Sequence, residues 1–126
     1  MKETKFYICE KCGNIITLVE KSGAPVSCCG QHMTELKAGT VEASREKHIP
    51  VATVADGKVK VCVGSVSHPM TAEHNIGWVY LETDKGHQLK YLASDAAPEV
   101  EFAIGDEKPV AVYAYCNLHG LWKSDI

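Results

Sequence analysis

Residues 113–122, Tyr-Ala-Tyr-Cys-Asn-Leu-His-Gly-Leu-Trp, constrain this chain most, because a strand-like run there ends in a thiol and an imidazole three residues apart. A short turn after a strand lets the side chains of Cys116 and His119 converge on one point, as the two ligands of a metal ion do. The same spacing also occurs in turns that bind nothing. The pair therefore predicts a metal site only if other parts of the chain supply further ligands.

Length and composition limit the class of protein. The 126 residues are 45% hydrophobic and 23% charged, which is typical of a globular protein with one main core. The net charge of −3 gives no broad basic surface, so we expect no nucleic-acid or anionic-membrane partner. The N-terminal sequence lacks the apolar core of a secretory signal, and no later apolar run approaches the length of a membrane span. We therefore expect a cytoplasmic protein.

Six cysteines in a reducing compartment indicate metal ligands rather than disulfides. Cys9 and Cys12 form a Cys-x-x-Cys motif, and Cys28 and Cys29 are adjacent. A glycine after each pair allows a tight turn that points backbone amides at the sulfurs. Four thiolates make a closed tetrahedral site, which suits zinc and a single iron equally well. The segment is too short to bury a sufficient core, so metal binding would supply much of its folding free energy. Structural zinc and redox iron both stay open.

From residue 49 onward the chain consists of short strand-like stretches separated by turn signals, at 49–54, 58–66, 76–83, 88–93, 99–104 and 110–116. Alternation puts Val59, Val61 and Val63 on one face of the second stretch. No stretch has helical periodicity, and residues 38–46 are predicted to form a linker or loop. The pattern is typical of an antiparallel β-sandwich of the immunoglobulin type. We predict a mostly β protein with a small metal domain at 1–37 and the sandwich at 38–126.

Four histidines lie beside the turns of the predicted sandwich, namely His48, His68, His74 and His119. Each alone is compatible with a solvated loop residue, but four of them together with Cys116 indicate a common site. Imidazole suits iron, copper and zinc, and a thiolate adds strong electron donation. Four nitrogens and one sulfur exceed tetrahedral zinc. They fit square-pyramidal iron with an axial thiolate and a sixth position open to a small molecule. We expect His32 and His87, with ordinary polar neighbours, at the surface.

In order along the chain, these motifs resemble desulfoferrodoxin, the family of two-iron superoxide reductases. The matching segments are Cys-x-x-Cys and Cys-Cys, then Glu-Lys-His-Ile-Pro, Ser-His-Pro-Met, Glu-His-Asn-Ile-Gly-Trp-Val and Cys-Asn-Leu-His-Gly-Leu-Trp. The resemblance implies a desulforedoxin-like domain with a rubredoxin-type iron centre at Cys9, Cys12, Cys28 and Cys29. It also implies an immunoglobulin-like domain whose catalytic iron is held by His48, His68, His74, His119 and Cys116.

The resemblance further implies an activity, partners and two more site residues. The activity is one-electron reduction of superoxide to hydrogen peroxide, with rubredoxin as the usual donor, in a homodimer. Lys47 would attract the superoxide anion, and Glu46 would occupy the open position of ferric iron; without the resemblance they are an ordinary solvated charge pair. Cys62 matches no ligand, and we expect a packed or exposed strand thiol.

The residues themselves leave alternatives open. The chain is compatible with an electron carrier, with a zinc-bearing binding module and with a superoxide dismutase. The centre formed by the four N-terminal cysteines is compatible with an electron relay and with a purely structural role.

Overall fold

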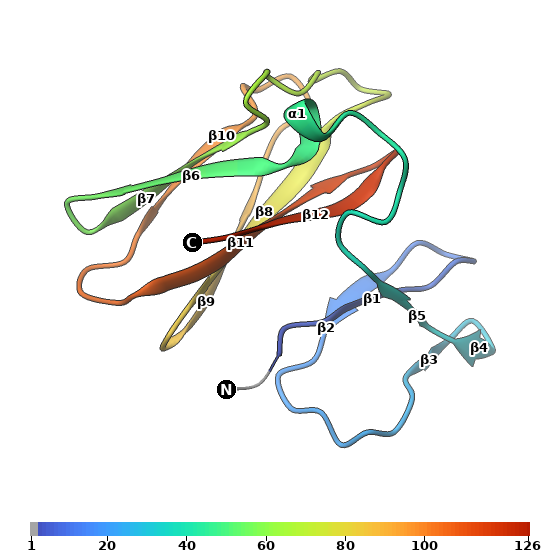
Figure 1. The fold of residues 1–126 in the computed structure, drawn as a ribbon. Coiled ribbons are helices and arrows are strands. Elements are labelled where there is room, and N and C mark those ends of the chain that lie inside the picture. Colours follow the sequence, from blue (N-terminus) through green and yellow to red (C-terminus); the bar gives the residue numbers. More distant parts are fainter. Residues whose placement is uncertain (1–2) are drawn as a thin grey trace. The chain divides into compact units, whose positions relative to one another are not determined.

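The structure is a computed structural model and describes residues 3–126, so the first two residues of the predicted N-terminal domain lie outside it. The described chain divides into two compact units, one ending at Lys37 and the other running from Ala38 to Ile126. Both are built from antiparallel strands (Figure 1). The helix among residues 3–126 is α1, Arg45–His48. No helix in this range has the length and the apolar sequence that a membrane crossing requires.

The first unit is small and has little core. β1 (Phe6–Ile8) lies between β2 (Ile15–Thr17) and β5 (Thr34–Leu36), and β3 (Ser27–Cys28) pairs with β4 (Gln31–His32). Phe6 and Cys9 are the buried residues among those described in this unit. So small an apolar core supports the expectation that metal binding contributes to folding here.

The second unit is a sandwich of two antiparallel sheets. One has the order β10-β7-β6, with β10 at Glu99–Ala103, β7 at Lys58–Val63 and β6 at Pro50–Ala55. The other has the order β12-β11-β8-β9, with β12 at Gly120–Asp125, β11 at Pro109–Cys116, β8 at Ile76–Thr83 and β9 at Gly86–Tyr91. This confirms the predicted fold class, a mostly β chain with an antiparallel sandwich.

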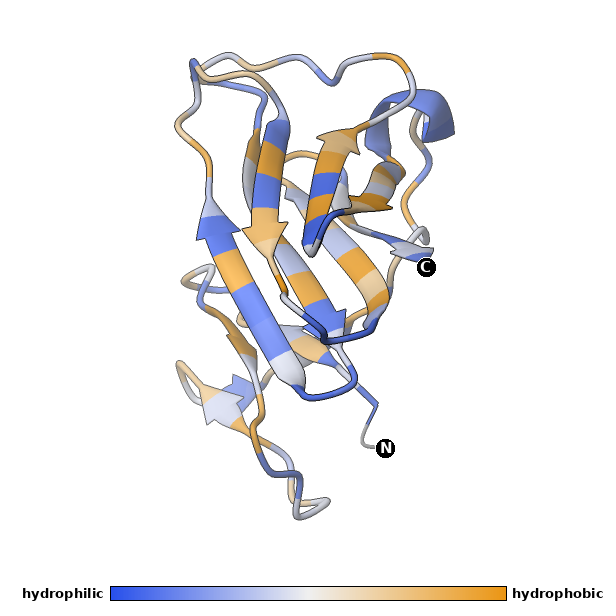
Figure 2. Ribbon diagram, turned by 90° about the vertical axis from the view of Figure 1, so that its left-hand side faces the viewer, coloured by the Kyte–Doolittle hydropathy of each residue, from blue (hydrophilic) through white to orange (hydrophobic). Residues whose placement is uncertain are grey.

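Alternation along the strands builds the core between the two sheets. Hydrophobic and polar residues alternate along the strands (Figure 2). Val59, Val61 and Val63 of β7 are fully buried, as predicted. They form one hydrophobic cluster with residues of the opposite sheet, including Val79 and Val112. Burying side chains of this size stabilises a fold by about 1.5–3 kcal/mol each.

A bulge at the end of β11 shapes the region around Cys116. Tyr115 pairs with Trp78, but Cys116 pairs with Ile76, so β8 has one extra residue, Gly77. Such bulges bend a strand and redirect its side chains. Here both Cys116 and Ile76 are fully buried.

The structure corrects three details of the sequence prediction. Residues 64–66 do not extend β7, because the chain turns at Gly64, whose φ is +87°. Arg45 and Glu46 belong to α1 instead of a loop, and a four-residue helix is too short to produce a periodic pattern. The strand β12 was not predicted, since its sequence Gly-Leu-Trp-Lys-Ser-Asp shows little alternation.

Candidate metal centres

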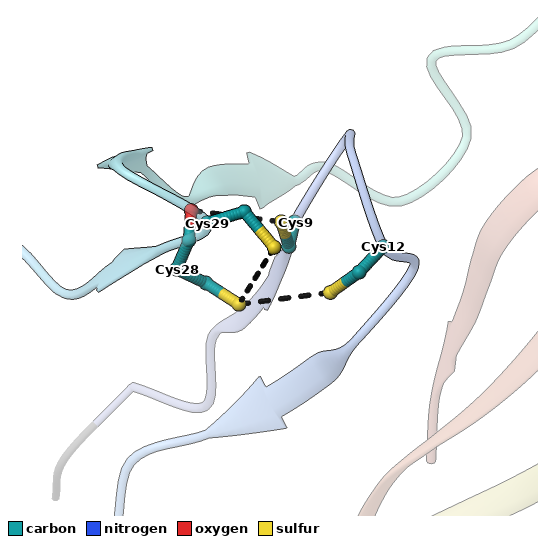
Figure 3. Close-up of side chains that lie close together, drawn as sticks. All are labelled: Cys9, Cys12, Cys28 and Cys29. Carbon is teal, nitrogen blue, oxygen red and sulfur yellow. Dashed lines mark hydrogen bonds between the residues drawn. The ribbon is translucent and has the colours of Figure 1, made fainter.

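Two tight turns present the four cysteines of the first unit. After β1 the chain reverses, and the Cys9 N–H donates to Asn14 O while the Gly13 N–H donates to Cys9 O, both at 2.8 Å. The second turn joins β3 to β4, and Cys29 and Gly30 adopt positive φ there, at 54° and 77°. Both turns direct their thiols to one point (Figure 3).

The four sulfur atoms form a cluster of the size that one metal ion needs. The Sγ atoms of Cys9, Cys12, Cys28 and Cys29 all lie within 4.8 Å of one another. Cys28 Sγ is 3.6 Å from Cys12 Sγ and 3.9 Å from Cys29 Sγ. Four sulfurs at about 2.3 Å from a tetrahedral metal lie about 3.8 Å apart. This cluster, the four-cysteine site, therefore has the dimensions of a tetrahedral metal site.

The ionisation of these thiols indicates that the four-cysteine site needs a cation. Backbone N–H groups, chiefly that of Cys12, lower the pKa of Cys9 to about 6. Hydrogen bonds with neighbouring thiols, chiefly Cys12, raise the pKa of Cys29 to about 12 and also raise that of Cys28. Sulfurs this close cannot all be negative unless a positive ion lies between them. A metal cation would offset the repulsion between the negative sulfurs, because cysteines bind metals as thiolates.

A second cluster lies at one end of the sandwich and takes its members from both sheets. His48 is the last residue of α1, before β6, and His68 lies in the loop after β7. His74 precedes β8, Cys116 ends β11, and His119 lies in the turn between β11 and β12. Two of the five residues thus flank the β10-β7-β6 sheet, and three flank the β12-β11-β8-β9 sheet. We call these five residues the His4Cys site.

The four imidazoles of the His4Cys site surround a common centre. Neighbouring ring centroids are 4.6 Å apart for His48–His68 and His68–His74, 5.1 Å for His74–His119 and 4.9 Å for His119–His48, and neighbouring rings are nearly perpendicular. His48 Nε2 lies 3.2 Å from His68 Nε2 and 3.1 Å from His119 Nδ1. Nitrogens at about 2.1 Å from a metal and at right angles lie about 3.0 Å apart. The spacing of these nitrogens is therefore compatible with ligands that bind one metal ion at right angles to each other.

Cys116 adds a sulfur to these nitrogens. Its Sγ lies 3.8 Å from His119 Nδ1 and within 4.8 Å of the ligand atoms of His48, His68 and His74. Its side chain is fully buried. The set of five donors is one larger than the set that tetrahedral zinc takes.

Hydrogen bonds on the outer side of two rings leave their inner nitrogens available to a metal. His48 Nδ1 lies 2.6 Å from Ser44 O, and His68 Nδ1 lies 2.7 Å from Pro69 O. Because a carbonyl only accepts, each Nδ1 carries the proton and each Nε2 keeps its lone pair. His74 Nε2 is buried and has no hydrogen-bond partner among the described residues. A buried nitrogen without a partner is costly, and a metal at the centre would satisfy it.

Burial sets the protonation of the site before any cation binds. Desolvation lowers the pKa of His48 and His74 and brings that of His68 to about 4. Burial raises the pKa of Cys116, while backbone N–H groups of the following turn oppose this rise. Neutral imidazole is the form that binds metals, and a bound cation would convert the thiol to thiolate. The donor set therefore fits iron.

Comparison with known proteins identifies the family. Residues 1–36 match the family described as Desulfoferrodoxin, N-terminal domain, and residues 40–125 match the family described as Desulfoferrodoxin. The desulfoferrodoxin of Nitratidesulfovibrio vulgaris is 43% identical over 121 residues, which cover 96% of this chain and 95% of that protein. This chain belongs to the desulfoferrodoxin family. The resemblance inferred from the motifs is thus confirmed.

Solved structures of superoxide reductases are similar to this chain. The superoxide reductase from Treponema pallidum is 44% identical with a TM-score of 0.83, covering 98% of this chain and all of that one. The superoxide reductase (1Fe-SOR) from Giardia intestinalis is 29% identical with a TM-score of 0.56, covering 64% of this chain and 97% of that one. The four-cysteine and His4Cys sites match the two iron centres of desulfoferrodoxin.

Glu46 and Lys47 lie in α1 directly before His48, and both are exposed. The helix is anchored to the loop after β7 by the Val66 N–H, which donates to Glu46 O at 3.0 Å. Burial is the main cause of the lowered pKa of His48 and His74, and the positive charge of Lys47 adds to it. The Lys47 charge therefore acts on the His4Cys site.

The sequence analysis did not single out Trp122, which contacts the ring of His48 and the backbone of His119 in the His4Cys site. Its ring centroid lies 5.1 Å from that of His48, and its Nε1–H donates to His119 O at 3.1 Å. It is 2% exposed. The sequence offered one indication of this role, namely that Trp122 lies in the run 113–122 together with Cys116 and His119. Only the fold shows that Trp122 contacts His48, which precedes the opposite sheet.

The remaining cysteine and histidines agree with expectation. Cys62 is half-buried on β7, and its Sγ–H donates to Glu99 Oε2 at 3.7 Å. His32 and His87 are exposed, and His87 stacks on Tyr80. All six cysteines are free thiols.

Proposed function

We propose that this protein is a superoxide reductase that works at the His4Cys site. Its main support is the convergence of four imidazoles and one buried thiol in a chain of the desulfoferrodoxin family. In the reaction, superoxide takes up one electron and two protons and leaves as hydrogen peroxide. An iron held in this site would supply the electron by passing from the ferrous to the ferric state.

In this proposal the iron would be held by His48, His68 and His74 through Nε2, by His119 through Nδ1 and by Cys116 through Sγ. The outer hydrogen bonds of His48 and His68 hold these two rings in the required tautomer. The backbone N–H groups that point at Cys116 Sγ stabilise its thiolate charge. The fold thus prepares both kinds of ligand before the metal arrives.

Lys47 provides the positive potential that draws superoxide to the site, against the net charge of −3. Glu46 would offer a carboxylate that competes with the product for a ferric iron held in the site. Its exposed carboxylate belongs to the helix that ends in His48. We expect Glu46→Ala to change the ferric absorption spectrum, and an unchanged spectrum would remove Glu46 from this role.

For the rest of the molecule we propose two domains, 1–37 and 38–126, with a second iron held by Cys9, Cys12, Cys28 and Cys29. We further propose a cytoplasmic homodimer with rubredoxin as the donor. The six free thiols support a reducing compartment. Unchanged turnover with rubredoxin in a Cys12→Ser protein would assign the four-cysteine site a structural role instead of a relay. A monomer mass in solution would contradict the dimer.

The deciding experiment measures the hydrogen peroxide formed per superoxide consumed by the iron-loaded protein. It requires an excess of a reductant that is itself slow toward superoxide. One peroxide per superoxide without dioxygen is the expected result. A yield near one half with dioxygen evolved would show dismutation and contradict the proposal.

A further inference from the structure

His74 is positioned differently from His48 and His68. The rings of those two residues are each held by a hydrogen bond from Nδ1 to a carbonyl. The hydrogen bonds described for His74 join its backbone to the backbone and the hydroxyl of Thr71 in the same loop. The Thr71 N–H donates to His74 O at 2.9 Å, and the His74 N–H donates to Thr71 Oγ1 at 3.0 Å. These bonds close the loop on itself but do not attach it to the rest of the site.

The side chain of Asn117 makes that attachment on both sides of His74. Its Oδ1 accepts from the Asn75 N–H at 2.9 Å, and its Nδ2 donates to Glu73 O at 2.9 Å. The Asn117 N–H also donates to Asn75 O at 3.2 Å. One amide therefore brackets His74 by pairing with the residue before it and the residue after it.

Asn117 also lies between the other two ligands of the same sheet. It follows Cys116 directly and precedes His119 by two residues. The loop that carries His74 and the turn that carries Cys116 and His119 are thus joined by the backbone N–H of Asn117 and by both ends of its side-chain amide. A shift of this side chain would move the His74 ring relative to the sulfur.

We propose that Asn117 is a positioning residue that holds His74 against the Cys116–His119 turn and so fixes this imidazole among the other donors of the His4Cys site. The proposal rests on the proposed function only in taking His74 as a ligand. Removing a group that hydrogen-bonds directly to a ligating side chain changes metal affinity by about 10–100-fold, and we expect the lower end of this range for Asn117, which bonds to the backbone on either side of the ligand. Asn117 contacts neither metal nor substrate and acts through the Glu73–Asn75 segment.

The test compares Asn117→Ala, which removes both side-chain bonds, with Asn117→Asp. The aspartate keeps the acceptor for the Asn75 N–H but turns a second oxygen toward Glu73 O. We measure the rate of ferrous iron release to a chelator and the ferric absorption spectrum of the holoprotein. Iron release should be about tenfold faster in Asn117→Ala and intermediate in Asn117→Asp. The four-cysteine site is unaltered and gives an internal reference.

The matched control is Gln88→Ala, because Gln88 Nε2 donates to Ala103 O at 2.8 Å and no ligand of either site lies nearby in the strand pairing. This variant should release iron like the parent. If the ferric spectrum of Asn117→Ala is the same as that of the parent, Asn117 stabilises only the loop, and the proposal is wrong. The expected spectrum moves toward that of His74→Ala.

His74→Ala also separates the two proposals. If it loses iron while Asn117→Ala does not, only the positioning role is wrong. If it retains iron and spectrum like the parent, the ligand assignment of His74 fails, and the positioning role fails with it. Neither measurement requires turnover of superoxide.

Discussion

Cys116 is a thiol that the fold only partly prepares for ionisation. Burial raises its pKa, and the N–H groups of the next turn lower it again. A bound cation must supply the remaining stabilisation of the thiolate. The protonation state of this residue is therefore coupled to metal binding.

We expect Cys116→Ser to abolish the sulfur-to-iron absorption band of the His4Cys site and to weaken its iron binding by at least about tenfold, since loss of an outer partner alone has such an effect. Visible spectroscopy and iron titration measure the two changes. Cys62→Ser is the matched control, because Cys62 lies outside both sites. Retention of the band in Cys116→Ser would disprove the axial assignment.

Lys47 should act on the rate of encounter with superoxide. Lys47→Ile removes a positive charge that acts on His48 and His74, so we expect the bimolecular rate to fall by about tenfold and its salt dependence to flatten. Pulse radiolysis at several ionic strengths measures both. Lys60→Ile removes an exposed charge from β7 and should have little effect. If both substitutions lowered the bimolecular rate equally, the cause would be the net charge of the protein and not the position of Lys47.

His68 makes the stability of the iron-free protein depend on pH. Its pKa falls from 6.5 to about 4 on folding, chiefly by burial. Between these values the unfolded chain binds a proton that the folded chain does not, so stability decreases as the pH falls from about 6.5 to 4. Urea unfolding of iron-free protein across this range should show the decrease, and His68→Gln should show a smaller one. If the free energy of unfolding fell equally steeply with pH in both proteins, His68 would not be the cause of the pH dependence.

At the scale of elements, Gly64 allows the loop after β7 to pack under α1. Its φ is +87°, and a Cβ atom there would clash with the carbonyl oxygen of Val66 in the same loop and would lie 2.7 Å from those of Glu46 and Lys47 in α1. A side chain would therefore strain the backbone and displace the helix that ends in His48. The position of α1, and with it the exposure of Glu46 and Lys47 beside the site, depends on this glycine.

Gly64→Ala should lower the free energy of unfolding by more than the strain alone, which is about 1–3 kcal/mol. Urea unfolding followed by tryptophan fluorescence measures the loss. Gly39→Ala is a matched control, because Gly39 has a φ of +70° but open space around its Cβ position. Equal losses in the two variants would show that crowding under α1 contributes nothing.

The elements differ in how far the sequence predicted them. β7 and β8 were predictable because apolar residues and turn signals define them locally. The register of β8 was not predictable, because the extra residue Gly77 is visible only in the pairing of β8 with β11. The ligand candidates were found from local motifs. Asn117 and Trp122 could not be found from local motifs, because their roles depend on which loops the fold brings together.

At the scale of the whole molecule, the candidate ligands of the His4Cys site are divided between the two sheets. His48 and His68 flank the β10-β7-β6 sheet, while His74, Cys116 and His119 flank the other. Each sheet alone offers at most three donors. Iron would therefore cross-link the sheets at one end of the sandwich, and its binding free energy adds to the stability of the docked pair.

This division fixes when iron can act during folding. The five donors meet only after the sheets have docked, so iron should leave the refolding rate unchanged and slow unfolding. At an iron concentration of about 100 times Kd the stabilisation is about 2.7 kcal/mol, which corresponds to about 100-fold slower unfolding. Stopped-flow fluorescence reports this, because both tryptophans, Trp78 and Trp122, lie in the second unit. Faster refolding with iron would show that part of the site forms early. With the expected result, bound iron lowers the unfolding rate of the second unit. A chain that has lost its iron then unfolds faster and is more exposed to proteolysis.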